Sequence, residues 1–300
     1  MDTKSIVLKA RENGIVIPAF NVPHIPMVKP VAQAIVDENS VAMIQVARLE
    51  WEKMDAVSLE TVAEEYGKWC NIDHTLLHLD HIPVIDEDNL LVDYTALLKR
   101  AISAGYQSVM IDGSRLSLDE NIEASAEAVG IAHDAGVPCE AELGAVMGHE
   151  SGPRTPYEEI FATKKGFTSV DEAIAFVKET NVDWLSIAVG NIHGAVAEAT
   201  RNEKKPEARL DIEHVKALYA ATNIPLVLHG GSGIKIEFIR EAISSGIAKI
   251  NIGTEVRQAY EMALEASNND IEAARESVYK KVREVLSESL RISNSKDILS

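Results

Sequence analysis

The feature that most constrains this chain is the regular alternation of short apolar, β-branched segments with longer segments of helical periodicity. Eight segments have the composition of buried strands, and they are Ile15–Asn21, Ala42–Ala47, Thr75–Asp80, Ser108–Asp112, Val137–Leu143, Trp184–Gly190, Pro225–Gly230 and Ala248–Gly253. Eight strands with intervening helices predict an α/β fold, a single (β/α)8 barrel with a closed parallel sheet. Barrels of this kind commonly reach 300 residues as one unit, so we expect one domain over residues 1–300, with the polar segment 287–300 fraying.

Residues typical of helix starts and helix ends support this alternation of strands and helices. Ser117–Glu120 and Ser169–Glu172 match the capping box, in which a hydroxyl and a carboxylate satisfy unpaired N–H groups at a helix start. Glycines stand where four helices should end, since glycine adopts the left-handed conformation of a C-cap at low steric cost. These are Gly14, Gly105, Gly136 and Gly246.

Composition excludes several classes of protein. The formal net charge of −18 opposes binding to nucleic acid or to an anionic membrane, and no apolar stretch reaches the length of a membrane helix. Cys70 and Cys139 are the only cysteines, and the first residues lack an apolar export signal, so we expect a cytoplasmic protein without disulfides. An anionic substrate would need a locally favourable pocket on such an acidic chain.

Polar residues gather at the carboxyl ends of the predicted strands, where barrel enzymes place their active sites. They are Asn21, Asp80, His81, Asp112, Glu140, Glu142, His193, His229 and Asn251. Each alone would be explained equally well by a cap or a satisfied core residue. Together they predict a converging polar site at the barrel mouth.

Three histidines, His81, His193 and His229, follow three separate strands. Three neutral imidazoles with one open position describe a catalytic zinc site, although their separation in the sequence is too long for a local metal motif. Histidines in acid–base roles without a metal are the alternative.

Strands seven and eight carry a second signal. Gly230–Gly233 (GGSG) follows strand seven, and Gly253 and Thr254 follow strand eight. Barrel enzymes frequently bind phosphate in these two loops, where glycines admit backbone N–H groups and a helix N-terminus adds its dipole. Two ordinary tight turns are the alternative.

These residues fall in motifs that jointly resemble the class II fructose-bisphosphate and tagatose-bisphosphate aldolases. The motifs, in order from Pro18 to Glu255, are IPAFN (17–21), HLDH (78–81), SVMIDGS (108–114), EAELG (140–144), GNIHG (190–194), LHGGSG (228–233) and KINIGTE (249–255). The resemblance implies a (β/α)8 barrel, a homodimer or larger homo-oligomer, and Zn²⁺ or another divalent ion, with a monovalent cation as a second possible cofactor. It also implies cleavage of a phosphorylated ketose to dihydroxyacetone phosphate and an aldehyde.

Carried over by motif, the resemblance makes His81, His193 and His229 metal ligands, with Glu142 as an alternative ligand and Asp112 beside them. Asp80 would transfer the proton at the substrate C4 oxygen, and Glu150 would be the loop acid that handles the proton at the triose carbon. The triose and its phosphate would be held by Asn21, Gly194, Gly230, Gly231, Ser232, Asn251, Gly253 and Thr254. Successive residues of a regular strand face opposite sides, so Asp80 and His81 can act together only if the strand ends or bulges at Asp80.

The chain departs from the family's pattern on the side of the aldehyde. Residues 82–92 are an apparent insertion after HLDH, the loop before Glu150 reads Met-Gly-His, and Ala197 stands where a phosphate-binding lysine is common. Arg48 follows strand two where a serine is usual, and we expect it to contact an anionic group of the aldehyde half or to form a surface salt bridge. Two other hypotheses are a catalytically silent aldolase-like partner subunit and a metal-free phosphosugar lyase or isomerase on the same barrel.

Overall fold

A computed structural model describes residues 2–144, 157–191 and 208–300. Its strands are β1 (Ile17–Asn21), β2 (Ala42–Ala47), β3 (Thr75–Pro83), β4 (Ser108–Asp112), β5 (Cys139–Leu143), β6 (Trp184–Ile187), β7 (Leu226–Leu228) and β8 (Ile247–Ile252). Every neighbouring pair is parallel, and β8 pairs with β1, so the sheet closes in the order of the sequence. The predicted (β/α)8 barrel is confirmed.

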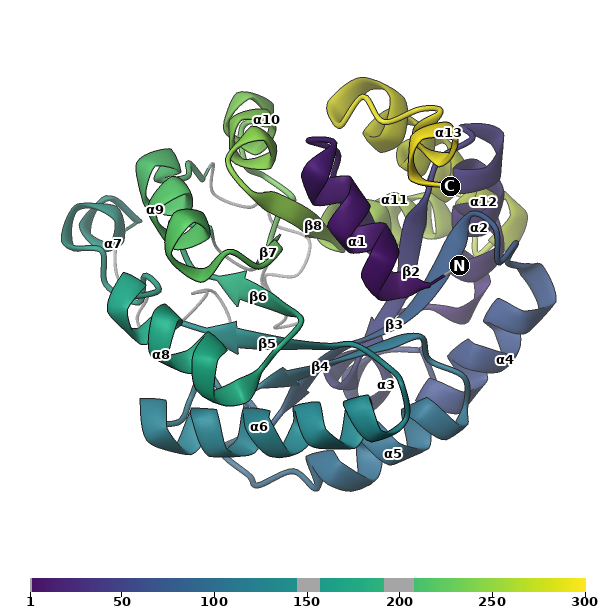
Figure 1. Cartoon of the computed structure of the whole chain (residues 1–300). Coiled ribbons are helices and arrows are strands. Elements are labelled where there is room, and N and C mark those ends of the chain that lie inside the picture. Colours follow the sequence, from purple (N-terminus) through teal and green to yellow (C-terminus); the bar gives the residue numbers. More distant parts are fainter. Residues whose placement is uncertain (1, 145–156, 192–207) are drawn as a thin grey trace.

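Helices surround the barrel (Figure 1). Those that connect consecutive strands are α2 (Val28–Asp37), α3 (Arg48–Lys53), α4 (Leu59–Trp69), α5 (Tyr94–Ser103), α6 (Leu118–Asp134), α7 (Tyr157–Thr163), α8 (Val170–Thr180), α9 (Ile212–Thr222) and α10 (Ile236–Ser244). After β8 come α11 (Thr254–Ala266), α12 (Ile271–Glu284) and α13 (Ser295–Leu299), with a π-helical turn at Val285–Ser289. A 3-10 turn, Ile25–Met27, precedes α2.

The predicted helix signals act as expected, except that Ser169–Glu172 forms only one half of the predicted capping box. Ser117 and Glu120 form the reciprocal capping box of α6, and the Ser169 hydroxyl accepts the backbone N–H of Glu172 at the start of α8. Gly14, Gly105, Gly136 and Gly246 all have positive φ, as a left-handed helix end requires. Residues 287–300, which we expected to fray, instead complete the π-helical turn and form α13, because the side chain of Leu299 is buried against α1 (Thr3–Glu12).

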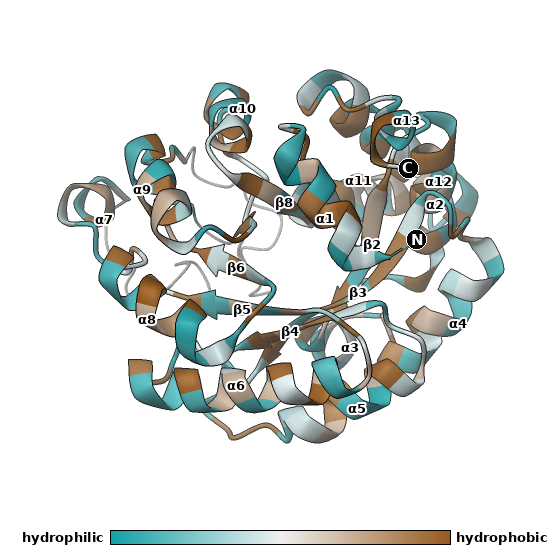
Figure 2. Ribbon diagram, viewed as in Figure 1, coloured by the Kyte–Doolittle hydropathy of each residue, from teal (hydrophilic) through white to brown (hydrophobic). Residues whose placement is uncertain are grey.

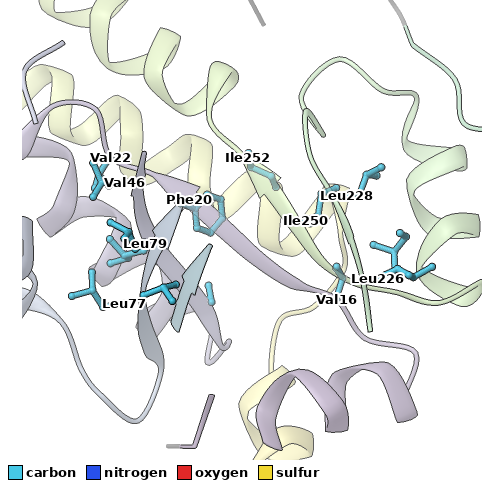
Figure 3. Close-up of a cluster of buried hydrophobic side chains, with 14 of the residues drawn as sticks. Val16, Phe20, Val22, Val46, Leu77, Leu79, Leu226, Leu228, Ile250 and Ile252 are labelled. Atoms are coloured by element: carbon cyan, nitrogen blue, oxygen red, sulfur yellow. The ribbon is translucent and has the colours of Figure 1, made fainter. Parts of the chain in front are cut away.

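Alternation along the strands produces two layers of core. Every second strand residue points outward and packs against the ring of helices, and Phe20, Leu79 and Ile250 lie in this layer (Figure 3). The surrounding helices alternate hydrophobic and hydrophilic residues along their length, as amphipathic helices do (Figure 2).

The alternate strand residues point inward and fill the barrel. At its amino-terminal end, α1 packs against inward residues such as Ile17, Met43 and Val227. Toward the carboxyl ends of the strands, the inward residues become polar.

No helix within the described residues is both long and apolar enough to cross a membrane.

Candidate active site

A β-bulge at the end of β3 brings two consecutive side chains to the same face. The register of β3 against β4 shifts between Leu79 and Ile82, and His81 has φ +32°, which lies in the left-handed region. Non-glycine residues rarely adopt this conformation, and such strain concentrates at functional sites. The predicted bulge is confirmed, and it lets both Asp80 and His81 point into the barrel mouth.

The rings of His81 and His229 converge from opposite sides of the mouth. His81 Nε2 lies 2.7 Å from His229 Nδ1, and the Glu142 carboxylate lies 3.4 Å from the same His229 nitrogen. Behind the first ring, Asp112 Oδ2 is 3.1 Å from His81 Nδ1. A carboxylate on the far nitrogen orients a metal-binding imidazole and fixes its tautomer. Asp112 therefore lies where it orients His81, while Glu142 lies where it can itself bind a cation.

Electrostatics at this point favour a positive charge. Burial lowers the pKa of His81, but the carboxylates of Asp80, Asp112 and Glu142 outweigh it and raise the pKa to about 10. Burial also raises the pKa of Glu142 to about 8, and repulsion from Asp112 adds to the rise. Acidic groups this crowded are stabilised by a cation, either a proton or a metal ion. Two overlapping groups of donor atoms lie close enough together to hold one ion, Asp80 with His81 and His229, and His81 with Asp112 and Glu142. Such nitrogen and oxygen donors suit zinc.

The carboxylate of Asp80 is held by three side-chain amides from three other strands. Asn21 Nδ2 and Gln45 Nε2 donate to Oδ2 at 3.0 and 3.2 Å, and Asn251 Nδ2 donates to Oδ1 at 2.9 Å. Burial raises the pKa of Asp80, but the charges of His81, His229 and Lys249 together outweigh burial, so the pKa is lowered. Asp80 is thus an oriented, ionised carboxylate beside the histidine pair.

The two predicted phosphate loops lie together. Gly231 N–H donates to Asn251 O at 3.2 Å, and Ser232 Oγ is 3.5 Å from the backbone nitrogen of Glu255, in the first turn of α11. A Cβ at Gly253 would come within 3.3 Å of Asn21 Oδ1, so this loop closely approaches the group that holds Asp80. Gly230 has φ +64°, and Thr254 is the first residue of α11. The loops therefore lie around the N-terminus of α11, next to the Asp80 carboxylate.

Arg48 lies at the start of α3, after β2, and faces the inserted segment. Its Nη1 is 3.3 Å from Oδ2 of Asp86, whose side chain is 5% exposed. The other oxygen of Asp86 accepts the N–H groups of Asp88 and Leu90, and Val92 N–H bonds to Val84 O. The segment after β3 is therefore an ordered loop anchored to Arg48.

Sequence reasoning missed residues that lie in this network. Gln45 and Lys249 are buried in the barrel interior and bond directly to predicted site residues. Strand alternation is the signal that could have found Lys249, because it stands two residues before Asn251. Glu140 was predicted to face the site but was given no role, and its carboxylate lies 2.8 Å from His229 Nε2. Of the predicted site, His193, Gly194 and Glu150 lie outside the described residues, as does Ala197.

The family model described as fructose-bisphosphate aldolase class-II matches residues 1–298. This chain belongs to that family. A fructose-bisphosphate aldolase from Helicobacter pylori is 34% identical over 282 residues, which cover 85% of this chain and 83% of the relative. A 6-phospho-5-dehydro-2-deoxy-D-gluconate aldolase from Shouchella clausii is 39% identical over 199 residues, covering 66% and 59%.

Among solved structures, the YdjI aldolase from Escherichia coli K12 superposes with a TM-score of 0.76 at 28% identity, over 98% of each chain. The predicted activity of a class II aldolase, a metal-dependent carbon–carbon lyase that acts on a phosphorylated ketose, is confirmed by family membership.

Proposed function

We propose that the chain reversibly cleaves a fructose- or tagatose-bisphosphate-like ketose to dihydroxyacetone phosphate and an aldehyde, using Zn²⁺ or a similar divalent ion. The observation that carries this proposal is the convergence of His81 Nε2 and His229 Nδ1, 2.7 Å apart, beside Glu142. His193 is the third proposed ligand, Glu142 the alternative one, and Asp112 the group behind His81. When bound there, the ion would stabilise the negative charge left on the triose as the carbon–carbon bond breaks.

Asp80 is the proposed proton acceptor. Cleavage requires removal of the proton of the C4 hydroxyl, and condensation requires its return to the same oxygen. Nearby charges, His81 foremost, favour the ionised carboxylate of Asp80, and the three amides that bond it set its direction before the substrate arrives. Glu150 is the proposed acid for the proton at the triose carbon.

The triose phosphate is proposed to bind at the two glycine loops. The backbone N–H of Ser232, with the N-terminus of α11, would donate to a phosphate, while Gly230 and Gly231 let the chain approach it closely. The hydroxyls of Ser232 and Thr254 add donors, Gly194 contributes from the loop after β6, and Gly253 allows close approach. Asn21 and Asn251 would contact the triose from the side that holds Asp80.

The aldehyde half is proposed to lie toward β2 and the insertion, with Arg48 at its anionic end. The ion pair with Asp86 restrains the guanidinium, which can bond two acceptors at once. Fructose- and tagatose-type substrates carry phosphate there, whereas a carboxylate or sulfonate would suit the same arginine.

We further propose that residues 1–300 act as one domain, that the chain forms a homodimer or homotetramer, and that it works in the cytoplasm. The acidic chain supports the absence of nucleic acid among its partners. A monovalent cation is the proposed second cofactor.

The experiment that tests the function is a condensation screen of dihydroxyacetone phosphate against phosphorylated, carboxylated and neutral aldehydes, with metal analysis of the same preparation. About one divalent ion per chain and product formation that a chelator abolishes and Zn²⁺ restores are expected. Product formation that survives complete removal of metal would instead support the metal-free lyase. Metal binding without turnover on any aldehyde, and without hydrogen exchange in dihydroxyacetone phosphate, would support the silent partner subunit.

A further inference from the structure

A buried lysine lies in the barrel interior, one inward position below the site. Lys249, in β8, is 0% exposed. An ammonium group in such a place is strongly destabilising unless charged and polar partners surround it. Its partners are Glu140 and Asn251, and each of them bonds to a different part of the proposed catalytic apparatus.

The first partner leads to the metal ligand. Lys249 Nζ lies 3.0 Å from Glu140 Oε2, which also accepts the Trp184 indole N–H at 2.8 Å. The other oxygen, Glu140 Oε1, is 2.8 Å from His229 Nε2. A carboxylate held in this way receives the Nε2–H of His229 and leaves Nδ1 as the nitrogen that faces His81. Lys249 therefore fixes the acceptor that sets the tautomer and ring orientation of His229.

The second partner leads to the proton-transfer carboxylate. Lys249 Nζ donates to Asn251 Oδ1 at 2.6 Å, and Asn251 Nδ2 donates to Asp80 Oδ1 at 2.9 Å. An ammonium group has donors only, so it fixes which end of the amide carries oxygen. The Asn251 amine is thereby directed at Asp80 rather than away from it.

We propose that Lys249 is a positioning residue for the aldol reaction, which orients the metal-binding His229 through Glu140 and the proton-transfer Asp80 through Asn251. This inference rests on the proposed function. One buried cation thus determines the relative placement of the group that binds the metal and the group that moves the proton. Lys249 need not touch the substrate to act through either Glu140 or Asn251.

The test compares Lys249→Met, which keeps the chain length and removes the donors, with the double variant Lys249→Met/Glu140→Gln. Lys216→Met, a change on the exposed surface of α9, is the matched control. The measurements are the free energy of unfolding, the Zn²⁺ dissociation constant by competition with a chromogenic chelator, and two rates at saturating Zn²⁺. Those rates are ketose cleavage and hydrogen exchange in dihydroxyacetone phosphate.

For Lys249→Met we expect the Zn²⁺ dissociation constant to rise about 10- to 100-fold and the kcat of cleavage to fall by a similar factor, the usual effect of losing a group that orients a ligand. Hydrogen exchange at saturating Zn²⁺ should fall much less, because Asp80 acts on the C4 hydroxyl and not on the triose carbon. The double variant no longer buries an uncompensated carboxylate, so its stability should recover while cleavage stays low. Lys216→Met should match the wild type in every measurement.

A purely structural role for Lys249 predicts a different pattern. Cleavage and exchange by Lys249→Met would then fall together, in proportion to the loss of folded protein, or the Zn²⁺ dissociation constant of the folded fraction would stay at the wild-type value. Either result overturns the inference. A wild-type protein without Zn²⁺-dependent cleavage or exchange would overturn the proposed function itself, and the two failures are thereby distinguished.

Discussion

Substituting Glu50 by glutamine should make the protein more stable at alkaline pH and leave its stability nearly unchanged at acidic pH. Glu50 is 9% exposed, at the start of α3, and its Oε2 accepts the Ala47 N–H at 2.8 Å and lies 3.3 Å from Asn21 Nδ2. Burial raises the pKa of Glu50 to about 8, with repulsion from Asp80 contributing and the Ala47 N–H opposing. Because both donors reach the same oxygen, the carbonyl of a glutamine can replace it.

The sign follows from proton linkage. Between the ordinary carboxyl pKa of 4.5 and the folded value of about 8, the folded chain binds a proton that the unfolded chain has lost, so stability falls as the pH rises through this window. The difference of about 3.5 units corresponds to at most about 5 kcal/mol, fully lost above pH 8. Water and side-chain relaxation reduce this penalty, and we expect about 2–3 kcal/mol in practice. Glutamine does not ionise and avoids the penalty.

Urea denaturation of the Zn²⁺-saturated wild type and of Glu50→Gln at pH 5.5 and pH 8.5 measures the effect. Glu52→Gln, on the exposed side of the same helix, is the control and should follow the wild type at both values. Other titrating groups are common to the proteins and cancel in the difference where they do not couple to Glu50. A Glu50→Gln protein that is less stable than the wild type by the same amount at both pH values would refute the reasoning.

Three further substitutions separate the roles at the site. Asp80→Ala should retain wild-type Zn²⁺ content and lose at least about 100-fold in cleavage rate, because the proposed proton acceptor is gone, and wild-type cleavage would refute the assignment. His229→Ala should lose Zn²⁺ affinity by at least about 10-fold, measured by chelator competition, and unchanged affinity would remove it from the ligands. Arg48→Ala should raise KM for the ketose about 10-fold and spare hydrogen exchange in dihydroxyacetone phosphate, since a charged hydrogen bond contributes about 1.5–3 kcal/mol. Equal effects on both reactions would argue against an aldehyde-side role.

Strand positions were largely predictable because apolar runs bounded by polar residues are distinctive in a buried parallel sheet. β2 and β4 begin and end where the sequence predicts. β3 instead continues to Pro83, because the bulge at Asp80 and His81 interrupts its pairing with β4 without ending the strand. β6 and β7 are shorter than expected, since their last predicted residues turn into the loops of the site.

The contacts within the site were less predictable than its members. Strand alternation alone places Lys249 on the face of Asn251, but its bond to Glu140 depends on how side chains from β5 and β8 meet across the barrel. Gln45 is similar: nothing in its own segment shows that its amide reaches Asp80, on the adjacent strand. The ion pair of Arg48 with Asp86 depends on the folded shape of an insertion that the family's motifs do not include.

An acidic chain can bind an anionic substrate here because the proposed metal ion and the substrate phosphate would be bound by different groups. Asp80, Asp112, Glu140 and Glu142 lie inside the barrel, where Lys249 and His81 face them and a divalent cation would be further stabilised. The proposed phosphate loops rely instead on backbone N–H groups and the N-terminus of α11, which need no basic side chain. The buried carboxylates are thus stabilised by a bound cation, and that cation would offset their repulsion of the triose phosphate at close range.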